Sequence, residues 1–165
     1  MGSHIIMSAP EHLQLLLDGI RRIVQTLNTR SREVEKRSGI SMAQLFVLQR
    51  LKEENGLSIN ELAARTYTHQ SSVSVVVQKL KDRKLVSSKP SEADARKMVI
   101  SLTAEGKKLL QRAPNAAQDT FIEAFRSMPT AKQAQFAQLM SEYTGSEMFG
   151  TMPPMLFERS ESEEG

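Results

Sequence analysis

The stretch of residues 57–106 constrains the fold most strongly, because its pattern predicts a short helix, a turn, a second helix and a β-hairpin in that order. Apolar side chains of the second helix have the i, i+3, i+4, i+7 spacing of one buried helical face: Val73, Val76, Val77 and Leu80. The opposite face has short or uncharged side chains: Ser71, Ser74, Val75 and Gln78. Such side chains allow close approach to the edges of DNA bases, whereas a helix that only covers a core normally exposes long charged groups.

The first helix of this stretch has a clear start signal. Ser58 and Glu61 have the spacing of a capping box, and Leu57 and Leu62 have the spacing of a hydrophobic staple. Residues 67–69 then separate the two helices by a turn of the length that is typical of a helix-turn-helix. The pair of helices therefore favours nucleic-acid binding over a helix pair that only packs a core.

The run of valines also permits another interpretation. β-branched residues between 73 and 77 are typical of a buried strand, and serine and glutamine also occur on ordinary amphipathic helices. Strict alternation is absent, however, and the helical spacing continues through Leu80. A helix is therefore the better prediction for this segment.

Two segments with strand character follow, at 85–90 and 97–102, and turn-forming residues at 90–94 join them. Asp94 and Arg96 lie at the tip of this predicted hairpin, where the carboxylate can hold the guanidinium in one orientation as it enters a narrow groove. The alternative is a solvated pair that contributes only ~0–1 kcal/mol to stability. The position of the hairpin after a recognition-type helix favours the first interpretation.

Three segments of the sequence, 80–86, 90–96 and 100–106, resemble the multiple antibiotic resistance regulator (MarR) family of bacterial transcription factors. The resemblance covers most of the chain, and its most specific part is Asp-x-Arg in the wing followed by Leu-Thr-x-x-Gly. It implies a homodimer whose recognition helices enter successive major grooves of double-stranded DNA, while Arg96 of each wing enters the minor groove. It further implies a repressor that leaves a pseudo-palindromic operator when a small aromatic or acidic effector binds between the winged module and the dimerisation helices.

The sequence departs from the family pattern at two positions. Lys84 stands where the family usually has a glycine after the recognition helix, so a left-handed end of that helix is either strained or replaced here. Ser88 stands where a basic residue is common, and the adjacent Lys89 is then the expected phosphate contact in the wing.

These arguments predict a set of DNA-binding residues with three roles. Lys79 and Lys97 are expected to hold phosphates, the short side chains of the recognition helix to read the major groove, and Arg96 to read minor-groove shape. The full set is Gln70, Ser71, Ser72, Ser74, Val75, Gln78, Lys79, Lys89, Asp94, Arg96 and Lys97.

Apolar periodicity predicts helices outside the motif as well. We expect a long helix from Pro10 to about Ser38, ended by Gly39, and a second helix that starts with a capping box at Ser41 and Gln44. After the hairpin, Thr103 is expected to cap one long helix that reaches about Ser127 and is kinked at Pro114; a last helix is expected to be capped by Thr130 with Gln133.

The first and the last two of these helices have more apolar stripe than the winged module can cover. A partner surface is the natural place to bury it, so we expect a homodimer; the alternative is a helical bundle within one chain. The predicted fold is mainly α with a small β-hairpin wing, a winged helix-turn-helix with N- and C-terminal dimerisation helices. The predicted organisation is a cloning remnant at 1–6, dimerisation helices at 7–38 and 104–148, the winged module at 39–103, and an acidic, mobile tail at 149–165.

Charge is distributed unevenly along the chain. The net charge is +3, but between Arg65 and Lys108 ten basic side chains stand against four acidic ones, whereas from Gly145 onward five acidic side chains stand against one basic. A basic module of this kind is typical of a surface that binds phosphates, although basic patches also serve solubility.

Other classes of function find little support. The chain has no cysteine, so disulfides and thiolate chemistry are absent, and His12 and His69 outside the presumed remnant lack metal-ligand spacing. P-loop, dinucleotide and nucleophile-elbow patterns are also absent, so we expect no enzyme activity, no metal and no cofactor. Because no apolar run approaches the length of a membrane span and no secretory signal is visible, we expect a cytoplasmic protein.

One alternative function remains open, a dimeric helical interaction protein whose winged module binds another protein. The salt dependence of duplex binding distinguishes the two, because neutralising phosphates gives a steep slope and a protein-binding groove need not.

Overall fold

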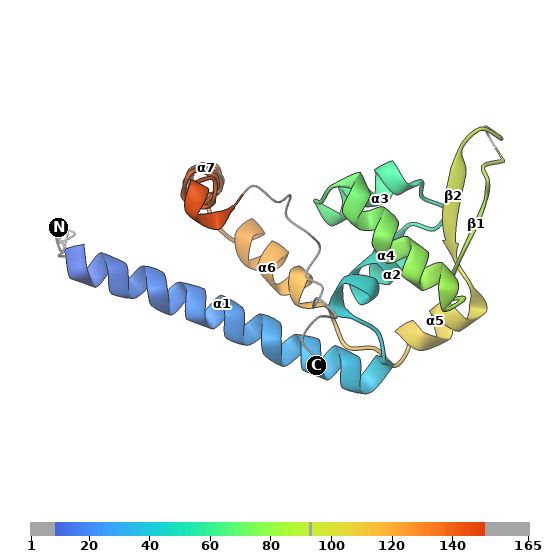
Figure 1. Ribbon diagram of the computed structural model, residues 1–165, viewed down its shortest axis with the longest axis horizontal. Helices are drawn as coiled ribbons and strands as arrows, with labels where there is room; N and C mark the ends of the chain where they lie inside the picture. The colour runs from blue at the N-terminus through green and yellow to red at the C-terminus, as the bar shows by residue number, and fades with distance from the viewer. Residues whose placement is uncertain (1–8, 93, 151–165) are drawn as a thin grey trace.

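The structure is a computed structural model that describes residues 9–92 and 94–150 (Figure 1). Its helices are α1 (Ala9–Ser38), α2 (Met42–Glu53), α3 (Ile59–Thr66), α4 (Gln70–Asp82), α5 (Ala104–Leu110), α6 (Ala117–Arg126) and α7 (Thr130–Thr144), and its strands are β1 (Val86–Pro90) and β2 (Met98–Leu102). A short 3₁₀ helix, η1 (Glu147–Phe149), follows α7. This mainly helical fold with an antiparallel hairpin confirms the predicted fold class.

The long helix α1 belongs to two parts of the molecule. Its C-terminal end packs into the core through Val34, and it ends at Gly39, whose φ of +67° is a conformation that glycine adopts without strain. The rest of α1 extends away from the winged module, with α6 lying along it (Figure 1). Most of its apolar side chains are exposed, including Leu13, Leu16, Leu17, Ile20, Ile23 and Val24.

The core of the winged module is built around α2. Its first seven residues are all buried, and α4 packs against it with the four apolar residues that the sequence pattern predicted. The predicted capping box is present at the start of α2, where Ser41 and Gln44 exchange backbone-to-side-chain hydrogen bonds. Because each fully buried Val, Leu or Phe contributes roughly 1.5–3 kcal/mol, this cluster fixes the position of α4.

The structure confirms two predicted features of the helix-turn-helix, the capping box at the start of its first helix and the turn between its two helices. At the N-terminus of α3, the Ser58 hydroxyl donates to Glu61 at 2.7 Å, and the Ser58 backbone amide donates to the same carboxylate at 2.8 Å. These two hydrogen bonds lower the pKa of Glu61. Residues 67–69 connect α3 to α4, and Tyr67 has left-handed backbone angles, so the chain reverses sharply before α4 begins at Gln70.

The wing is a two-stranded antiparallel sheet, one residue shorter in each strand than the sequence predicted. Val86 pairs with Leu102 at its base and Pro90 with Met98 near its tip. A single bridge between Leu57 and Ile100 attaches β2 to the segment before α3. The wing is thus anchored to the start of the helix-turn-helix.

The left-handed end predicted for α4 is present at Lys84, so the backbone there is strained and has not been replaced by another conformation. Lys84 has a φ of +58°, a left-handed conformation that is unfavourable for a residue with a Cβ atom. Its backbone amide donates to Lys81 and the amide of Leu85 donates to Leu80, so the helix closes with a normal C-terminal arrangement around an unfavourable residue.

Replacing Lys84 with glycine should raise the free energy of unfolding by ~0.5–1 kcal/mol, because relief of left-handed strain exceeds the added entropy of an unfolded glycine. Chemical denaturation measures the change. Lys84→Ala is the matched control, since it removes the charge and keeps the Cβ, and it should give no gain. If Lys84→Ala stabilised the protein as much as Lys84→Gly, removal of the charge and not relief of backbone strain would explain the gain.

The single kinked helix expected over 103–127 is wrong. Thr103 caps α5 as predicted, accepting from the Gly106 amide at 3.1 Å, but α5 ends at Leu110 and residues 111–116 are not helical before α6 begins. Pro114 lacks an amide donor, its ring clashes with the preceding turn, and it disfavours helical angles at Ala113. The proline therefore interrupts the helix instead of bending it.

The predicted cap of the last helix is also wrong. Thr130 is the first residue of α7, Pro129 occupies the N-cap position, and the Gln133 side chain donates to the Met128 carbonyl at 2.7 Å. A proline at the cap position contributes no side-chain acceptor, so the polar side chain that follows bonds outward to the loop instead. The predicted remnant at 1–6, and the predicted tail beyond residue 150, lie outside the described residues.

Candidate nucleic-acid interface

The outward face of α4 is the first part of the candidate site. Burial of the valine face of this helix leaves Gln70, Ser71, Ser74, Val75 and Gln78 exposed. Val75, an apolar residue, keeps 45% of its surface exposed. A valine on an exposed face is suited to contact with a thymine methyl group. The structure thus brings five of the predicted groove-reading residues onto one surface.

Ser72 does not belong to that surface, and its predicted role is corrected. Only 1% of its surface is exposed, so its hydroxyl lies inside the module and not where a base edge can be reached. The sequence contained the signal, because Ser72 is four residues before Val76 and eight before Leu80, on the same helical stripe as the core.

Gln78 is exposed but already engaged. Its amide nitrogen donates to the Asp82 carboxylate at 2.8 Å, one helical turn further along α4. A bidentate contact with adenine therefore requires Gln78 to leave Asp82. This competing contact, which sequence reasoning missed, is a normal i, i+4 pair and could have been read from the spacing.

The basic residues at the end of α4 divide into two groups. Arg83 donates to the carbonyl of Gly39, so it ties the end of the recognition helix to the junction of α1 and α2. Lys81 and Lys84 are exposed, and Lys79 is half-buried at the edge of α4. The exposed lysines remain able to attract phosphates.

The tip of the wing differs from its predicted geometry. The Asp94 carboxylate accepts a hydrogen bond from the backbone amide of Arg96 at 3.0 Å, and the Asp94 carbonyl accepts from the Lys97 amide at 2.9 Å. The expected contact of this carboxylate with the guanidinium is thus replaced by one that shapes the backbone of the turn, as aspartate commonly does. The Arg96 side chain is exposed.

Two further basic residues surround the wing. Lys89 is exposed on β1, and Lys97 is exposed just before β2. The charge of Lys97 adds to the lowering of the pKa of Glu61 at the start of α3, which shows that this lysine lies close to the helix-turn-helix. The wing and the recognition helix therefore belong to one basic module, from which the hairpin projects (Figure 1).

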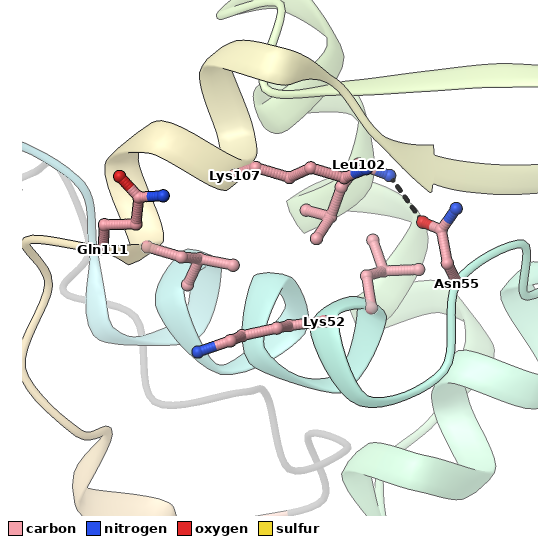
Figure 2. Close-up of a pocket in the computed structure, with 7 residues that line it drawn as sticks. Lys52, Asn55, Leu102, Lys107 and Gln111 are labelled. Carbon is pink, nitrogen blue, oxygen red and sulfur yellow. Dashed lines mark hydrogen bonds between the residues drawn. The ribbon is translucent and has the colours of Figure 1, made fainter.

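A pocket lies beneath the wing, with a volume of about 340 Å³. It is lined by Leu51, Lys52, Asn55, Leu102, Lys107, Leu110 and Gln111. Figure 2 shows Lys52 on α2 across from Lys107 and Gln111 on and just after α5, and the hydrogen bond from the Leu102 amide to Asn55, which is 2.9 Å long. Leucine walls and two ammonium groups suit a small organic anion.

Other binding chemistry finds no site in the part of the chain that the structure describes. Within residues 9–92 and 94–150 there is no group of three His, Asp or Glu side chains that could hold a metal ion. In the same residues, no helix is both long and apolar enough to cross a membrane.

Comparison with known sequences agrees with this geometry. The model of the MarR family matches residues 38–97. The transcriptional repressor MdtR of Bacillus subtilis is 30% identical over 96 residues, which are 56% of this chain and 62% of MdtR. The transcriptional repressor Rv2887 of Mycobacterium tuberculosis is 26% identical over 104 residues, 63% of this chain and 75% of that protein. The chain thus spans less than two thirds of MdtR, and both relatives are named as transcriptional repressors.

Solved structures share the fold. The MarR family regulator Sco3205 of Streptomyces coelicolor, solved in complex with DNA, has a TM-score of 0.59 and 20% identity, with 91% of this chain and 94% of that chain covered. A MepR-like protein solved with pseudoligands has a TM-score of 0.54 and 22% identity over 88% of this chain and all of that chain. The similarity extends beyond the winged module to the long flanking helices.

Proposed function

We propose that this chain, whose residues 38–97 match the model of the MarR family, is a sequence-specific DNA-binding repressor, a homodimer that a small molecule releases from its operator. The observation that supports this most directly is the exposed face of α4, short and uncharged, beside a wing that projects an exposed arginine. We place its action in the cytoplasm, where DNA is accessible.

The proposed dimer rests on uncovered apolar surface. Within the described chain, seven large hydrophobic residues of α1 and four of α7 are exposed, the latter being Phe136, Leu139, Met140 and Tyr143. Contiguous apolar surface of this kind normally marks an interface, and a second copy of the same chain presents matching stripes. Two copies also place two recognition helices on one operator, at half-sites about one helical turn apart.

The proposed roles of the DNA-binding residues follow their positions. Ser71, Ser74 and Val75 read base edges in the major groove, while Arg96 enters the minor groove. Gln70 and Gln78 add amide contacts from either end of the helix, with Gln78 exchanging Asp82 for a base. Lys79, Lys89 and Lys97 contact phosphates, which gives affinity and register without sequence information. Asp94 acts through the backbone of the wing turn.

The proposed release by an effector rests on the pocket beneath the wing. A bound anion with an apolar body would lie beside the hydrogen bond between Asn55 and Leu102, which connects the end of α2 to the base of the wing. Displacing Asn55 would loosen β2 and change the position of Arg96. Repression itself is proposed from MdtR and Rv2887, which are named as repressors.

Selection of bound sequences from random duplex DNA tests the proposal. We expect a pseudo-palindrome with A·T-rich flanks, because a narrow minor groove attracts the wing arginine. Binding should weaken steeply with salt. Failure to enrich any duplex sequence, with tight and salt-insensitive binding to a protein partner, would support the alternative of a helical interaction protein.

Arg96→Ala should weaken operator binding by about tenfold or more and reduce the salt slope of the dimer by about two units, roughly one for each protomer. The reason is that one cation per protomer leaves the minor groove, while helix content and assembly stay unchanged. Fluorescence anisotropy titrations at several salt concentrations measure both quantities.

Arg32→Ala is the matched control, because Arg32 is an exposed arginine on α1, away from the wing. It should keep wild-type affinity and slope. Asp94→Asn should also bind well, since an amide oxygen can still accept from the Arg96 backbone, whereas Asp94→Ala should bind more weakly. Wild-type behaviour of Arg96→Ala would mean that the wing does not touch DNA.

A further inference from the structure

One ion pair connects the winged module to the C-terminal arm, which consists of α6 and α7. Arg50 of α2 and Asp119 of α6 approach to 2.6 Å, and only 16% and 25% of their side chains are exposed. Arg50 is also held by Glu53 at 3.1 Å, and its guanidinium lies 4.9 Å from the centre of the Phe46 ring. A half-buried arginine fixed on three sides is a rigid anchor for the carboxylate of α6.

The covalent connection does not set the direction of α6. Residues 111–116 are not helical, so α6 is not a rigid continuation of α5. α6 lies along α1, and its polar contacts with the winged module include the Arg50–Asp119 pair and a hydrogen bond from Arg126 to the Tyr67 hydroxyl at 2.9 Å. These polar contacts add to the packing of Ala117, Phe121 and Ile122 of α6 against the core, and together they orient the arm relative to the helix-turn-helix.

The surroundings of the ion pair are incompletely satisfied. Among the described residues, both side-chain polar atoms of Gln118 are buried without a hydrogen-bond partner, as are Gln49 Oε1 and Arg50 Nε. Buried polar groups without partners raise the free energy of the arrangement that contains them. Once the ion pair is lost, a small rotation of α6 that gives these atoms partners would recover part of this cost.

We propose that the Arg50–Asp119 ion pair sets the separation of the two recognition helices in the dimer, and thereby the half-site spacing that the protein accepts in its operator. Both are positioning residues, since neither lies on the DNA-facing surface of α4 or the wing. The inference rests on the proposed function, because α6 and α7 belong to the proposed dimerisation surface while α4 belongs to the DNA-binding module. A fixed arm gives one spacing, and a loose arm accepts several.

The first experiment measures the separation of the recognition helices without DNA. The chain has no cysteine, so Lys81→Cys gives one labelling site per protomer at an exposed position on α4. Spin labels at this site report the distance between the two copies of α4 in the free dimer by pulsed electron resonance. We expect one narrow distance distribution in the parent and a broad or shifted one in Asp119→Asn.

The second experiment measures binding to operators whose half-sites are moved apart or together one base pair at a time. Asp119→Asn should reduce the preference for the best spacing by about tenfold, while the salt slope and the sedimentation of the dimer stay unchanged. Glu123→Gln is the matched control, because it removes the same charge from an exposed position on α6. Asp119→Glu keeps the charge and should rescue a single preferred spacing.

The results separate the two proposals. A narrow, unshifted distance distribution and a wild-type spacing profile in Asp119→Asn would overturn the role of the ion pair while leaving DNA binding intact. If Asp119→Asn loses helix content, the test rests on Asp119→Glu, which keeps the carboxylate. A broad distribution of distances between the two copies of α4 in Asp119→Glu would then count against the proposal. If the wild type selects no duplex at all, the proposed function fails, and the distance measurement still shows whether the ion pair fixes the arm.

Discussion

Replacing both Leu16 and Ile20 of α1 with glutamate should convert the protein to a monomer and weaken operator binding by about 100-fold or more. Both side chains are exposed within one chain and lie on the apolar stripe of α1, so the substitutions leave the core of the winged module untouched. Each protomer would bring two glutamate carboxylates into the dimer interface. Burying these charges without partners costs free energy and strongly opposes association.

The expected loss of operator affinity is large because the dimer binds two connected half-sites at once. When one recognition helix is bound, the dimer holds the second close to its half-site, and this effective concentration typically raises affinity by about 10²–10⁴-fold over a single module. Analytical ultracentrifugation checks the assembly, and titration on full and half operators checks the affinity. The variant should bind both duplexes with similar, weak affinity.

Gln14→Glu combined with Gln25→Glu is the matched control, because it adds the same charge to the same helix, away from the stripe. This control should remain dimeric and bind the full operator normally. A Leu16→Glu, Ile20→Glu protein that still sediments as a dimer would place the interface elsewhere, with α7 as the remaining exposed apolar surface.

Gly106→Ala should have the largest effect on folding, with a loss of ~3 kcal/mol or more of stability or failure to form the wing base. A Cβ atom at this position would overlap the carbonyl oxygen of Leu85 and lie 3.3 Å from the Leu102 side chain. The nearest neighbour is backbone, so it cannot move aside as a flexible side chain would. The glycine of the Leu-Thr-x-x-Gly pattern is thus required for close packing of α5 against the wing.

The Leu85 carbonyl is also a structural acceptor. It accepts from the backbone amide of Thr103 at 3.2 Å and from the Thr103 hydroxyl at 3.0 Å, so displacing it disturbs the cap of α5 as well as the entry to β1. Chemical denaturation measures the loss. Gly19→Ala is the control, because no atom lies within 4 Å of its added Cβ, and this substitution in α1 should be neutral or stabilising. Equal stability of Gly106→Ala and the wild type would contradict the close approach.

Local signals in the sequence were sufficient for most of the winged module. Capping boxes at Ser41 and Ser58, the glycine after α1 and the valine face of α4 each depend on contacts within a few residues, and the structure confirms all of them. The break after α5 was predicted as a bend because periodicity continues on both sides of Pro114. Whether a proline bends or interrupts a helix depends on what the flanking turns pack against, which spacing alone does not reveal.

The candidate site was predictable to a similar extent. Exposure of Ser71, Ser74, Val75 and Gln78 follows from helical spacing, whereas Ser72 is buried because the buried face of α4 is wider than its apolar residues alone indicate. The backbone contact of Asp94 was missed because an aspartate near an arginine suggests an ion pair, while the turn geometry decides in favour of the amide. The contact between Arg50 and Asp119 joins residues 69 positions apart and had no sequence signal.

The wing has an open side that matters for solubility. β2 pairs with β1 and, through one bridge, with Leu57, so among the described residues β1 is the edge strand of the sheet. An exposed edge can pair with the same edge of another copy and start aggregation, and a wing that must project from the module cannot be covered. Lys89 and Pro90 at the outer end of β1 oppose such pairing, because the lysines repel one another and the proline offers no amide donor. Lys89 thus protects free molecules from joining edge to edge, independently of any contact with DNA.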